Sequence, residues 1–321
     1  MNILVTGGGG YIGSHVSKAL KKAGFIPVVY DHFLNSHHSA VKWGPSIQGD
    51  IHDIDALDLA FITYKPQGII HLASHIDVRE STRNPGKYYH NNVGGTLSLL
   101  EAAVRHGVLS VVFSSSAAVY GIPHQIPIHE DHPKAPINAY GRTKWMCEEL
   151  LFDFHQAHSL SSISLRYFNA AGADPEGEIG ESHDPETHLI PLALLTLLKK
   201  RSHLAVFGTD HLTFDGTAVR DYIHVSDLAD AHVKALQYIF DHPQAVALNL
   251  GTGQGHSVQQ VIQAIETVTE HSIPLQTMPR FPSDPPQLIA DARKARSLLN
   301  WNPQYSNLDT IIETAWKWLQ K

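Results

Sequence analysis

Short apolar runs alternate with longer amphipathic stretches along the first half of the chain. The runs have the length and the Val/Ile/Leu content of buried strands, and we expect strands at 2–6, 26–30, 46–50, 68–73, 108–113 and 161–168. The stretches between them carry apolar residues at helical spacing, and we expect helices at 15–24, 55–65, 91–107 and 138–158. Strands and helices that alternate in this way predict a parallel, doubly wound α/β sheet with right-handed crossovers.

The pattern changes after residue 168. Residues 169–188 are rich in Gly, Pro and acidic side chains, and we expect a long ordered loop with a function. Further on we expect helices at 189–201, 226–241, 257–270 and 307–320, strands at 204–207 and 246–250, a second loop at 208–219 and an apolar segment at 220–225. We therefore expect one domain over 1–168 and a smaller mixed α/β domain over 169–321, with residues from about 220 to 250 returning in part to the first sheet.

Composition fits this fold and narrows the partners. Hydrophobic residues make up 43% of the 321 positions and charged residues 17%, which is enough apolar content for a sizeable core. The net charge of −7 argues against nucleic acid, which needs a basic face. The single cysteine, Cys147, fits a reducing compartment, and we find neither a leader pattern nor an apolar run that could span a membrane. We expect a cytoplasmic protein without nucleic-acid or membrane partners.

Histidine is unusually frequent, at 23 residues. The clusters at 37–38 and 129–132 invite a metal interpretation, but both lie in loop-like surroundings without an i, i+4 pair on a clear helix. We therefore expect no metal site.

A glycine-rich turn, TGGGGYIGSH at 6–15, follows the first expected strand and opens the first helix. Gly7, Gly10 and Gly13 allow a tight turn, close approach of the backbone to a pyrophosphate and close packing of helix on strand. The helix N-terminus then offers free N–H groups to phosphates. Asp31 ends the second strand, where a carboxylate accepts hydrogen bonds from ribose hydroxyls and repels a 2′-phosphate. These features predict a Rossmann-type domain that binds NAD in preference to NADP, with Asp50 at the adenine edge.

A Tyr–Lys pair opens the helix at 138–158. Tyr140 and Lys144 are four residues apart and share one helical face. A phenol has a pKa near 10, and a neighbouring ammonium favours the phenolate, which can take a proton from a hydroxyl whose carbon loses hydride. Ser116 follows an expected strand, and ligands bind outside the carboxyl ends of such strands. We expect Ser116 to hold the hydroxyl that Tyr140 deprotonates.

Six segments together resemble one enzyme family: TGGGGYIGSH, YYHNNVGGT, FSSSAAVYG, YGRTK, LRYFNAAGA and GTAVRDYIHV. They are similar to the extended short-chain dehydrogenase/reductase family and, within it, to the UDP-glucose 4-epimerases. This resemblance implies a bound NAD that is not consumed and the interconversion of UDP-glucose and UDP-galactose. The sugar would be oxidised at C4, the 4-keto sugar would rotate, and hydride would return to its other face. A homodimer through the helices at 91–107 and 138–158 is also implied.

The resemblance carries the family's ligand positions onto this sequence. For NAD it implies Gly7, Gly10, Tyr11, Ile12, Gly13, Asp31, Asn35, Asp50, Ile51, Leu72, Ala73, Asn91, Ser114, Tyr140, Lys144 and Phe168. For the UDP-sugar it implies Ser116, Tyr140, Asn169, His188, Leu189, Val206, Phe207, Arg220 and Asp284. Arginine suits the diphosphate because its planar guanidinium binds phosphate oxygens with two parallel hydrogen bonds.

Some positions depart from the family pattern. In PRFPSD at 279–284, Phe281 replaces a second arginine and Ser283 a glycine, while Arg280 remains. Asp77 and Arg79 stand where the family has small residues, and Arg79 could restore the lost positive charge. Leu288, a medium-sized residue at the position that sets tolerance for N-acetylated sugars, leaves UDP-N-acetylglucosamine open, and UDP-xylose is also possible.

Two other classes of protein remain as alternatives. Dehydratases and decarboxylases of this fold carry an acid or base directly after the strand-end hydroxyl residue, where this chain has Ala117 and Ala118. An NAD-binding protein without activity would be expected to lose Ser116, Tyr140 or Lys144, and all three are present. The epimerase reaction is the interpretation that the sequence favours.

Overall fold

A parallel sheet of seven strands forms the centre of the molecule in the computed structural model, which describes residues 1–281 and 284–321. The strand order is β11-β6-β5-β4-β1-β2-β3, and each neighbouring pair is parallel. The strands are β1 (Asn2–Thr6), β2 (Ile26–Asp31), β3 (Ser46–Gln48), β4 (Gly68–His71), β5 (Ser110–Ser116), β6 (Ser161–Tyr167) and β11 (Ala245–Leu250). This order of strands confirms the predicted Rossmann-type fold.

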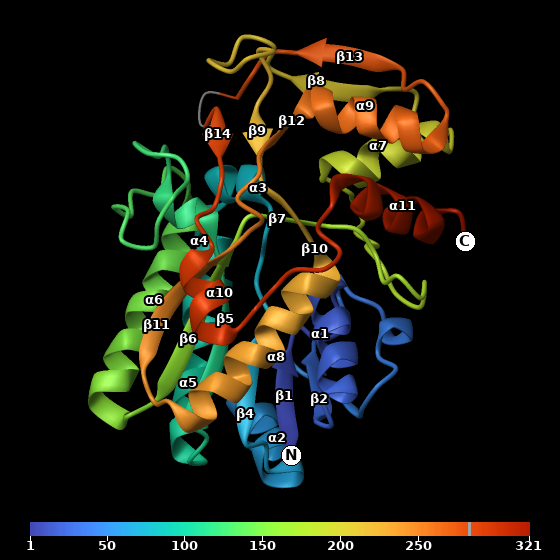
Figure 1. Ribbon diagram of the computed structural model, residues 1–321. Helices are drawn as coiled ribbons and strands as arrows, with labels where there is room; N and C mark the ends of the chain where they lie inside the picture. The colour runs from blue at the N-terminus through green and yellow to red at the C-terminus, as the bar shows by residue number, and fades with distance from the viewer. Residues whose placement is uncertain (282–283) are drawn as a thin grey trace.

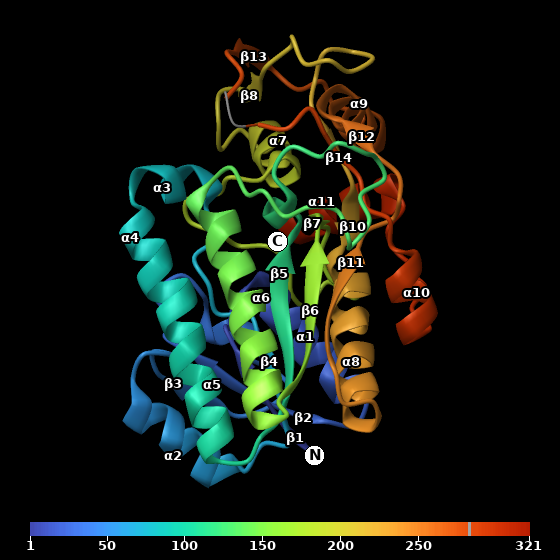
Figure 2. The same cartoon turned by 90° about the vertical axis from the view of Figure 1, so that its left-hand side faces the viewer.

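Helices cover both faces of this sheet (Figure 1). On one face α1 (Tyr11–Lys22) packs against α8 (Val225–Asp241), and their apolar sides share one core with β1, β5 and β6. On the other face α2 (Ile54–Tyr64), α5 (Gly95–Arg105) and α6 (Ala139–His158) share a second core. Figure 2 shows α5 and α6 side by side, with α8 on the opposite side of the sheet. Both faces are buried, which explains the continuous apolar runs of the strands.

A second layer lies over the carboxyl ends of the strands (Figure 1). Its helices α7 (Leu189–Leu197), α9 (Val258–Thr269) and α11 (Leu308–Leu319) share a third apolar core. Its strands form three small sheets: β7 (Asn169–Ala171) with β10 (Tyr222–His224), β8 (Leu204–Phe207) with β13 (Leu275–Met278), and β9 (Val219–Arg220) between β12 (His256–Ser257) and β14 (Gln287–Leu288). The carboxyl ends of the strands of the large sheet therefore face the second layer. The loops between the sheet and this layer lie where a ligand site of such a fold is expected.

The sequence predicted most elements, with several errors at their ends. α1 begins at Tyr11 rather than near residue 15, because Gly10 is extended and caps it directly after the glycine turn. β5 continues through Ser116 rather than ending at residue 113, because Ser114, Ser115 and Ser116 pair with β6. The helix expected at 91–107 begins with a π-helical turn (Tyr89–Gly94), and α7 ends at Leu197.

Shorter elements were missing from the expectation. They are α3 (Val78–Arg83), α4 (Pro85–Tyr88), α10 (Arg293–Leu299), the 3₁₀ turns His38–Ala40 and Ala117–Tyr120, and the strands β7, β12, β13 and β14. Segments of this length carry too few residues to show a period of 2 or 3.6. Of the helices within the described residues, none is both long and apolar enough to cross a membrane.

Candidate active site

The glycine turn between β1 and α1 forms a backbone cradle. Gly7 has a φ of 71°, in the left-handed region, and a Cβ there would lie 2.7 Å from the backbone nitrogen of Ala73. A Cβ on Gly13 would overlap the carbonyl oxygen of Gly7, so α1 can approach the turn this closely only without a side chain. The predicted reasons for these glycines, a tight turn and close packing, hold in the structure.

Asp31 holds this cradle from the end of β2. Its carboxylate accepts hydrogen bonds from the N–H of Gly9 at 2.9 Å, the N–H of Phe33 at 2.9 Å and the hydroxyl of Ser36 at 2.8 Å. The side chain thus fixes the glycine turn relative to the loop after β2. A pocket of about 180 Å³ opens beside it, lined among others by Gly10, Tyr11, Asn35 and His183. A cradle of N–H groups at a helix N-terminus beside a strand-end carboxylate fits a dinucleotide.

The other cofactor positions lie around the same edge of the sheet. Asp50 and Ile51 follow β3, and Leu72 and Ala73 follow β4 beside Gly7. Asn91 lies on the π-helical turn, where it donates to Asn92 at 3.0 Å. The sequence analysis overlooked Asn92, whose buried amide contacts both backbone groups of His75 and the Thr143 hydroxyl and so ties the loop after β4 to α6.

The structure brings Ser116, Tyr140 and Lys144 together. Ser116 is the last residue of β5, and Tyr140 and Lys144 lie in the first turns of α6. Burial raises the pKa of the Tyr140 phenol to about 12, and the Ser116 hydroxyl nearby partly opposes this rise. Burial lowers the pKa of Lys144 to about 8, and its ammonium donates to the Ser114 carbonyl at 2.8 Å. A hydroxyl, a phenol and an amine thus meet at the carboxyl end of a central strand.

A buried polar network behind this trio holds its elements in place. Ser115 donates to Glu148 on α6 at 2.5 Å, and Arg166 on β6 contacts the same carboxylate through two nitrogens at 2.5 and 2.8 Å. Arg166 also donates to the Tyr120 hydroxyl at 2.9 Å. Ser114 shares a short hydrogen bond with the Tyr167 hydroxyl. Within SSS, therefore, only Ser116 has its hydroxyl at Tyr140, while the other two bind the neighbouring elements.

The predicted substrate residues fall into separate groups. Phe168 packs beside Ala117, and Asn169 begins β7 with its N–H on the Asp221 carbonyl. Arg220 forms an ion pair with Asp284, so these two predicted residues do meet. Val206 and Phe207 are neighbours on β8 and point to opposite sides, with Val206 buried in the third core and Phe207 part-exposed.

Arg79 contacts the segment that departs from the family pattern. Its guanidinium carbon lies 4.5 Å from the ring centre of Phe207 and 3.9 Å from that of Phe281, and the two rings are 4.9 Å apart. Arg280, by contrast, faces Asp210 at 3.5 Å. Asp77 caps α3 by accepting from the N–H groups of Arg79 and Glu80. Ser283 lies outside the described residues. Arg79 therefore brings a positive charge to the position from which Phe281 has removed one.

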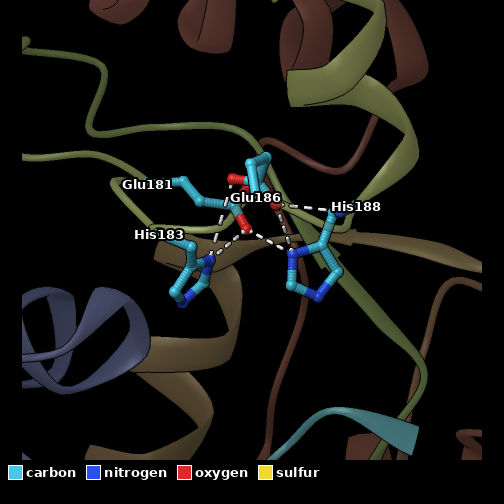
Figure 3. Close-up of side chains that lie close together, drawn as sticks. All are labelled: Glu181, His183, Glu186 and His188. Atoms are coloured by element: carbon cyan, nitrogen blue, oxygen red, sulfur yellow. Dashed lines mark hydrogen bonds and ion pairs between the residues drawn. The ribbon is translucent and has the colours of Figure 1, made fainter. Parts of the chain in front are cut away.

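His188 and Leu189 begin α7. His188 is the N-cap residue, and its side chain turns back towards Glu181 and Glu186, where His183 also lies (Figure 3). His183 lines the pocket at the glycine turn. The sequence analysis did not predict this cluster, although the pattern E-x-H-x-x-E-x-H at 181–188 marks it.

Known proteins resemble this chain over its whole length. Residues 3–251 match the NAD dependent epimerase/dehydratase family. The UDP-glucose 4-epimerase of Rhizobium meliloti (strain 1021) is 51% identical over 99% of this chain and 96% of its own length. The crystal structure of the Brucella ovis UDP-glucose 4-epimerase in complex with NAD has a TM-score of 0.96 at 48% identity and covers 98% of this chain and 97% of its own.

The similarity extends to a structure with both kinds of ligand. The UDP-glucose 4-epimerase of Bifidobacterium longum in complex with NAD⁺ and UDP is 36% identical, with a TM-score of 0.94, and covers 100% of this chain and 98% of its own. The fold agrees with that of these relatives over nearly the whole chain. This chain is a member of the NAD dependent epimerase/dehydratase family.

Proposed function

We propose that this protein interconverts UDP-glucose and UDP-galactose. The observation that carries the proposal is the convergence of Ser116, at the carboxyl end of β5, with Tyr140 and Lys144 at the start of α6, where Nζ of Lys144 lies 5.7 Å from the centre of the Tyr140 ring. Tyr140 takes the proton of the sugar C4 hydroxyl, which Ser116 positions, and returns it after the 4-keto sugar has turned over. Bound NAD, held by the glycine cradle and Asp31, supplies the hydride acceptor and donor.

Ala117 and Ala118 support epimerisation over elimination. Both follow Ser116 directly, in a 3₁₀ turn whose first N–H donor, that of Ala118, binds the Ser116 hydroxyl at 3.2 Å. Methyl groups at these positions cannot remove a proton at C5 or protonate a leaving hydroxyl, so a dehydratase or decarboxylase is the weaker alternative. Epimerisation needs neither group.

The substrate site is proposed for residues of the second layer. The UDP diphosphate is assigned to Arg220 with Asn169 and the start of α7, and the uracil to Val206 and Phe207. Asp284, the ion-pair partner of Arg220, completes the proposed nucleotide site. Leu288 on β14 packs against the apolar cluster of Ala117, Val119, Tyr120 and Ile128, and we infer that its size limits the space near the catalytic trio. Another UDP-sugar, such as UDP-N-acetylglucosamine or UDP-xylose, is the second candidate substrate. We assign the cofactor to residues 1–168 and the sugar nucleotide to residues 169–321, with the sugar C4 hydroxyl reaching Ser116 and Tyr140 of the first part.

The proposal includes a homodimer built from α5 and α6. The side chains of Leu97 on α5 and of Met146 and Phe152 on α6 are apolar and exposed. Because large exposed apolar groups favour contact with another surface, they support a dimer through these two helices. It also includes a cytoplasmic location, where the thiol of Cys147, buried between α5 and α6, remains reduced.

The test is turnover of UDP-galactose by the purified protein without added reductant. We expect UDP-glucose to form until the two sugars reach equilibrium, and Tyr140→Phe to lower the rate by about 10²–10⁴-fold while NAD stays bound. Wild-type protein that carries NAD but forms no UDP-glucose would refute the proposal. Parallel assays with UDP-N-acetylglucosamine and UDP-xylose identify the preferred sugar.

A further inference from the structure

Two glutamates and two histidines meet in the loop before α7 (Figure 3). Glu181, His183, Glu186 and His188 each offer one ligand atom, and these atoms all lie within 4.8 Å of one another. Both imidazole rings turn their Nδ1 atoms to the carboxylates. The cluster lies outside the Ser116–Tyr140–Lys144 trio. Of its four members only His188, the N-cap of α7, is also assigned to the UDP-sugar by the proposed function.

The ligand atoms of the two histidines lie close to those of the two glutamates. From Nδ1 of His183 the distances to oxygens of Glu181 and Glu186 are 3.0 and 3.8 Å, and from Nδ1 of His188 they are 2.7 and 3.1 Å. A Zn²⁺ ion with bonds of about 2.0–2.1 Å to nitrogen and oxygen has ligands about 3.3 Å apart along each tetrahedral edge. The four distances differ from that edge by about 0.2–0.6 Å, so small side-chain shifts would place the four ligands around one ion.

The electrostatics of the cluster also favour a cation. The side chains of Glu181 and Glu186 are only 6% and 8% exposed, and two buried carboxylates need compensating charge. Among the described residues, their ion-pair partners are His183 and His188 alone. A second acidic cluster, Asp174, Glu176 and Glu178, differs in this respect because the ammonium of Lys18 lies among all three carboxylates at 2.6–2.8 Å.

Glu186 is further oriented for ligation. Its Oε1 accepts hydrogen bonds from the backbone N–H groups of Thr187 at 2.7 Å and His188 at 2.8 Å. Such contacts around a first ligand shell fix its orientation and are a regular feature of metal sites.

We propose that Glu181, His183, Glu186 and His188 bind a structural divalent cation, with Zn²⁺ as the best fit to two imidazoles and two carboxylates. The ion would fasten the loop between β7 and α7 on two sides. His183 packs edge-on against the Tyr11 ring at 6.1 Å, next to the glycine turn, while His188 is the N-cap of α7. Metal binding would thereby fix the loop between β7 and α7 in position next to the glycine turn.

The competing arrangement has no metal and two imidazolium–carboxylate pairs. Without an ion, burial lowers the pKa of both rings, but the two glutamates together outweigh it and raise the pKa of His183 to about 9 and that of His188 to about 10, so both rings would be protonated at neutral pH. The two arrangements differ in what they bind, and a metal titration therefore separates them.

The experiment uses the purified holoenzyme, and its readout does not depend on turnover. Metal content is measured on protein as isolated, and chelator-treated protein is then titrated with Zn²⁺ by calorimetry and with Co²⁺ by absorption spectroscopy. We expect one equivalent of Zn²⁺, a d–d spectrum typical of tetrahedral Co²⁺, and a higher Tm in the presence of Zn²⁺. Glu181→Gln and His183→Asn should each lower the affinity by about 10–100-fold or more.

His242→Ala removes an exposed histidine at the end of α8, far from the cluster, and should leave binding unchanged. Two results would overturn the proposal. One is wild-type protein that binds neither metal at micromolar concentration. The other is binding that persists in both cluster variants, which would assign the ion to the chain's other histidines. The titration of wild-type protein alone decides whether the protein binds a metal ion. The test therefore still gives an answer if one of the variants fails to fold.

Discussion

The Nζ atom of Lys144 lies 5.7 Å from the centre of the Tyr140 ring and is fixed there by its hydrogen bond to the Ser114 carbonyl. The two residues are one helical turn apart on α6, so their relation follows from local geometry. Because burial raises the pKa of Tyr140 to about 12, the phenolate that the proposed reaction needs depends on positive charge nearby.

Replacing Lys144 should shift the pH dependence of the reaction. In Lys144→Met the phenolate loses a neighbouring cation, so the pKa of Tyr140 rises and fewer molecules carry the base at neutral pH. We expect the rate at pH 7 to fall by about 10²-fold or more and to recover in part as the pH increases. A pH–rate profile measures this. If Lys144→Met instead lowers the rate by the same factor at every pH, Lys144 acts in cofactor binding alone and does not set the pKa of Tyr140.

Substitutions of two neighbouring serines of β5 should have different effects, one on activity and the other on stability. Ser116→Ala removes the hydroxyl at Tyr140 and should lower kcat by about 10²-fold with little change in Tm. Ser115→Ala is the matched control, because its hydroxyl binds the buried Glu148. It should lower the free energy of unfolding by about 1–3 kcal/mol and leave kcat near wild type. Equal effects of the two variants on kcat would contradict these roles.

Arg79 should contribute to substrate affinity. Arg79→Ala removes the guanidinium that stacks on Phe207 and Phe281, and we expect KM for the UDP-sugar to rise about 3- to 10-fold with kcat little changed. Arg79→Lys should restore only part of the affinity, because an ammonium lacks the planar face. Arg83→Ala, on the same helix, is the control. An unchanged KM in Arg79→Ala would show that the stacking of Arg79 on the two rings does not contribute to substrate binding.

His232 should make the protein sensitive to acid. It is fully buried on α8, its Nε2 has no hydrogen-bond partner among the described residues, and burial lowers its pKa to about 4. The unfolded chain, with a histidine pKa of 6.5, binds a proton that the folded protein excludes, so stability falls as the pH drops from about 7 towards 4. The expected loss from this group is about 2 kcal/mol between pH 7 and 5. His232→Leu should flatten the dependence of Tm on pH over that range, and an unaltered slope would contradict the assignment.

The proposed dimer predicts a change of mass in solution. Phe152 is 52% exposed on α6, and Phe152→Glu places a charge at the centre of the proposed contact. Light scattering should then give the mass of a monomer in place of a dimer. Leu59→Glu, at an apolar position on α2 that is 63% exposed, should leave the mass unchanged.

The sequence predicted those parts of the site that depend on local spacing. These parts are the glycine turn, the strand-end Asp31 and the Tyr140–Lys144 pair. Each belongs to one element or one connection, so residues close in sequence determine its geometry. The network of Ser115, Glu148 and Arg166 could not be predicted, because its members come from three elements and meet only once the sheet has formed. The contact of Arg79 with Phe281 is non-local for the same reason. The cluster at 181–188 is local, and its alternation of Glu and His was visible in the sequence.

The position of β11 has a consequence for how the chain folds during synthesis. This strand pairs with β6 at the edge of the large sheet, and α8, which precedes it, covers α1 on one face. A nascent chain whose first 168 residues have left the ribosome therefore holds six of the seven strands but lacks the helix that shields Val16 and Leu20. Until residue 250 emerges, that apolar face stays open to water, and we expect this interval to be the one in which the growing chain depends most on chaperones.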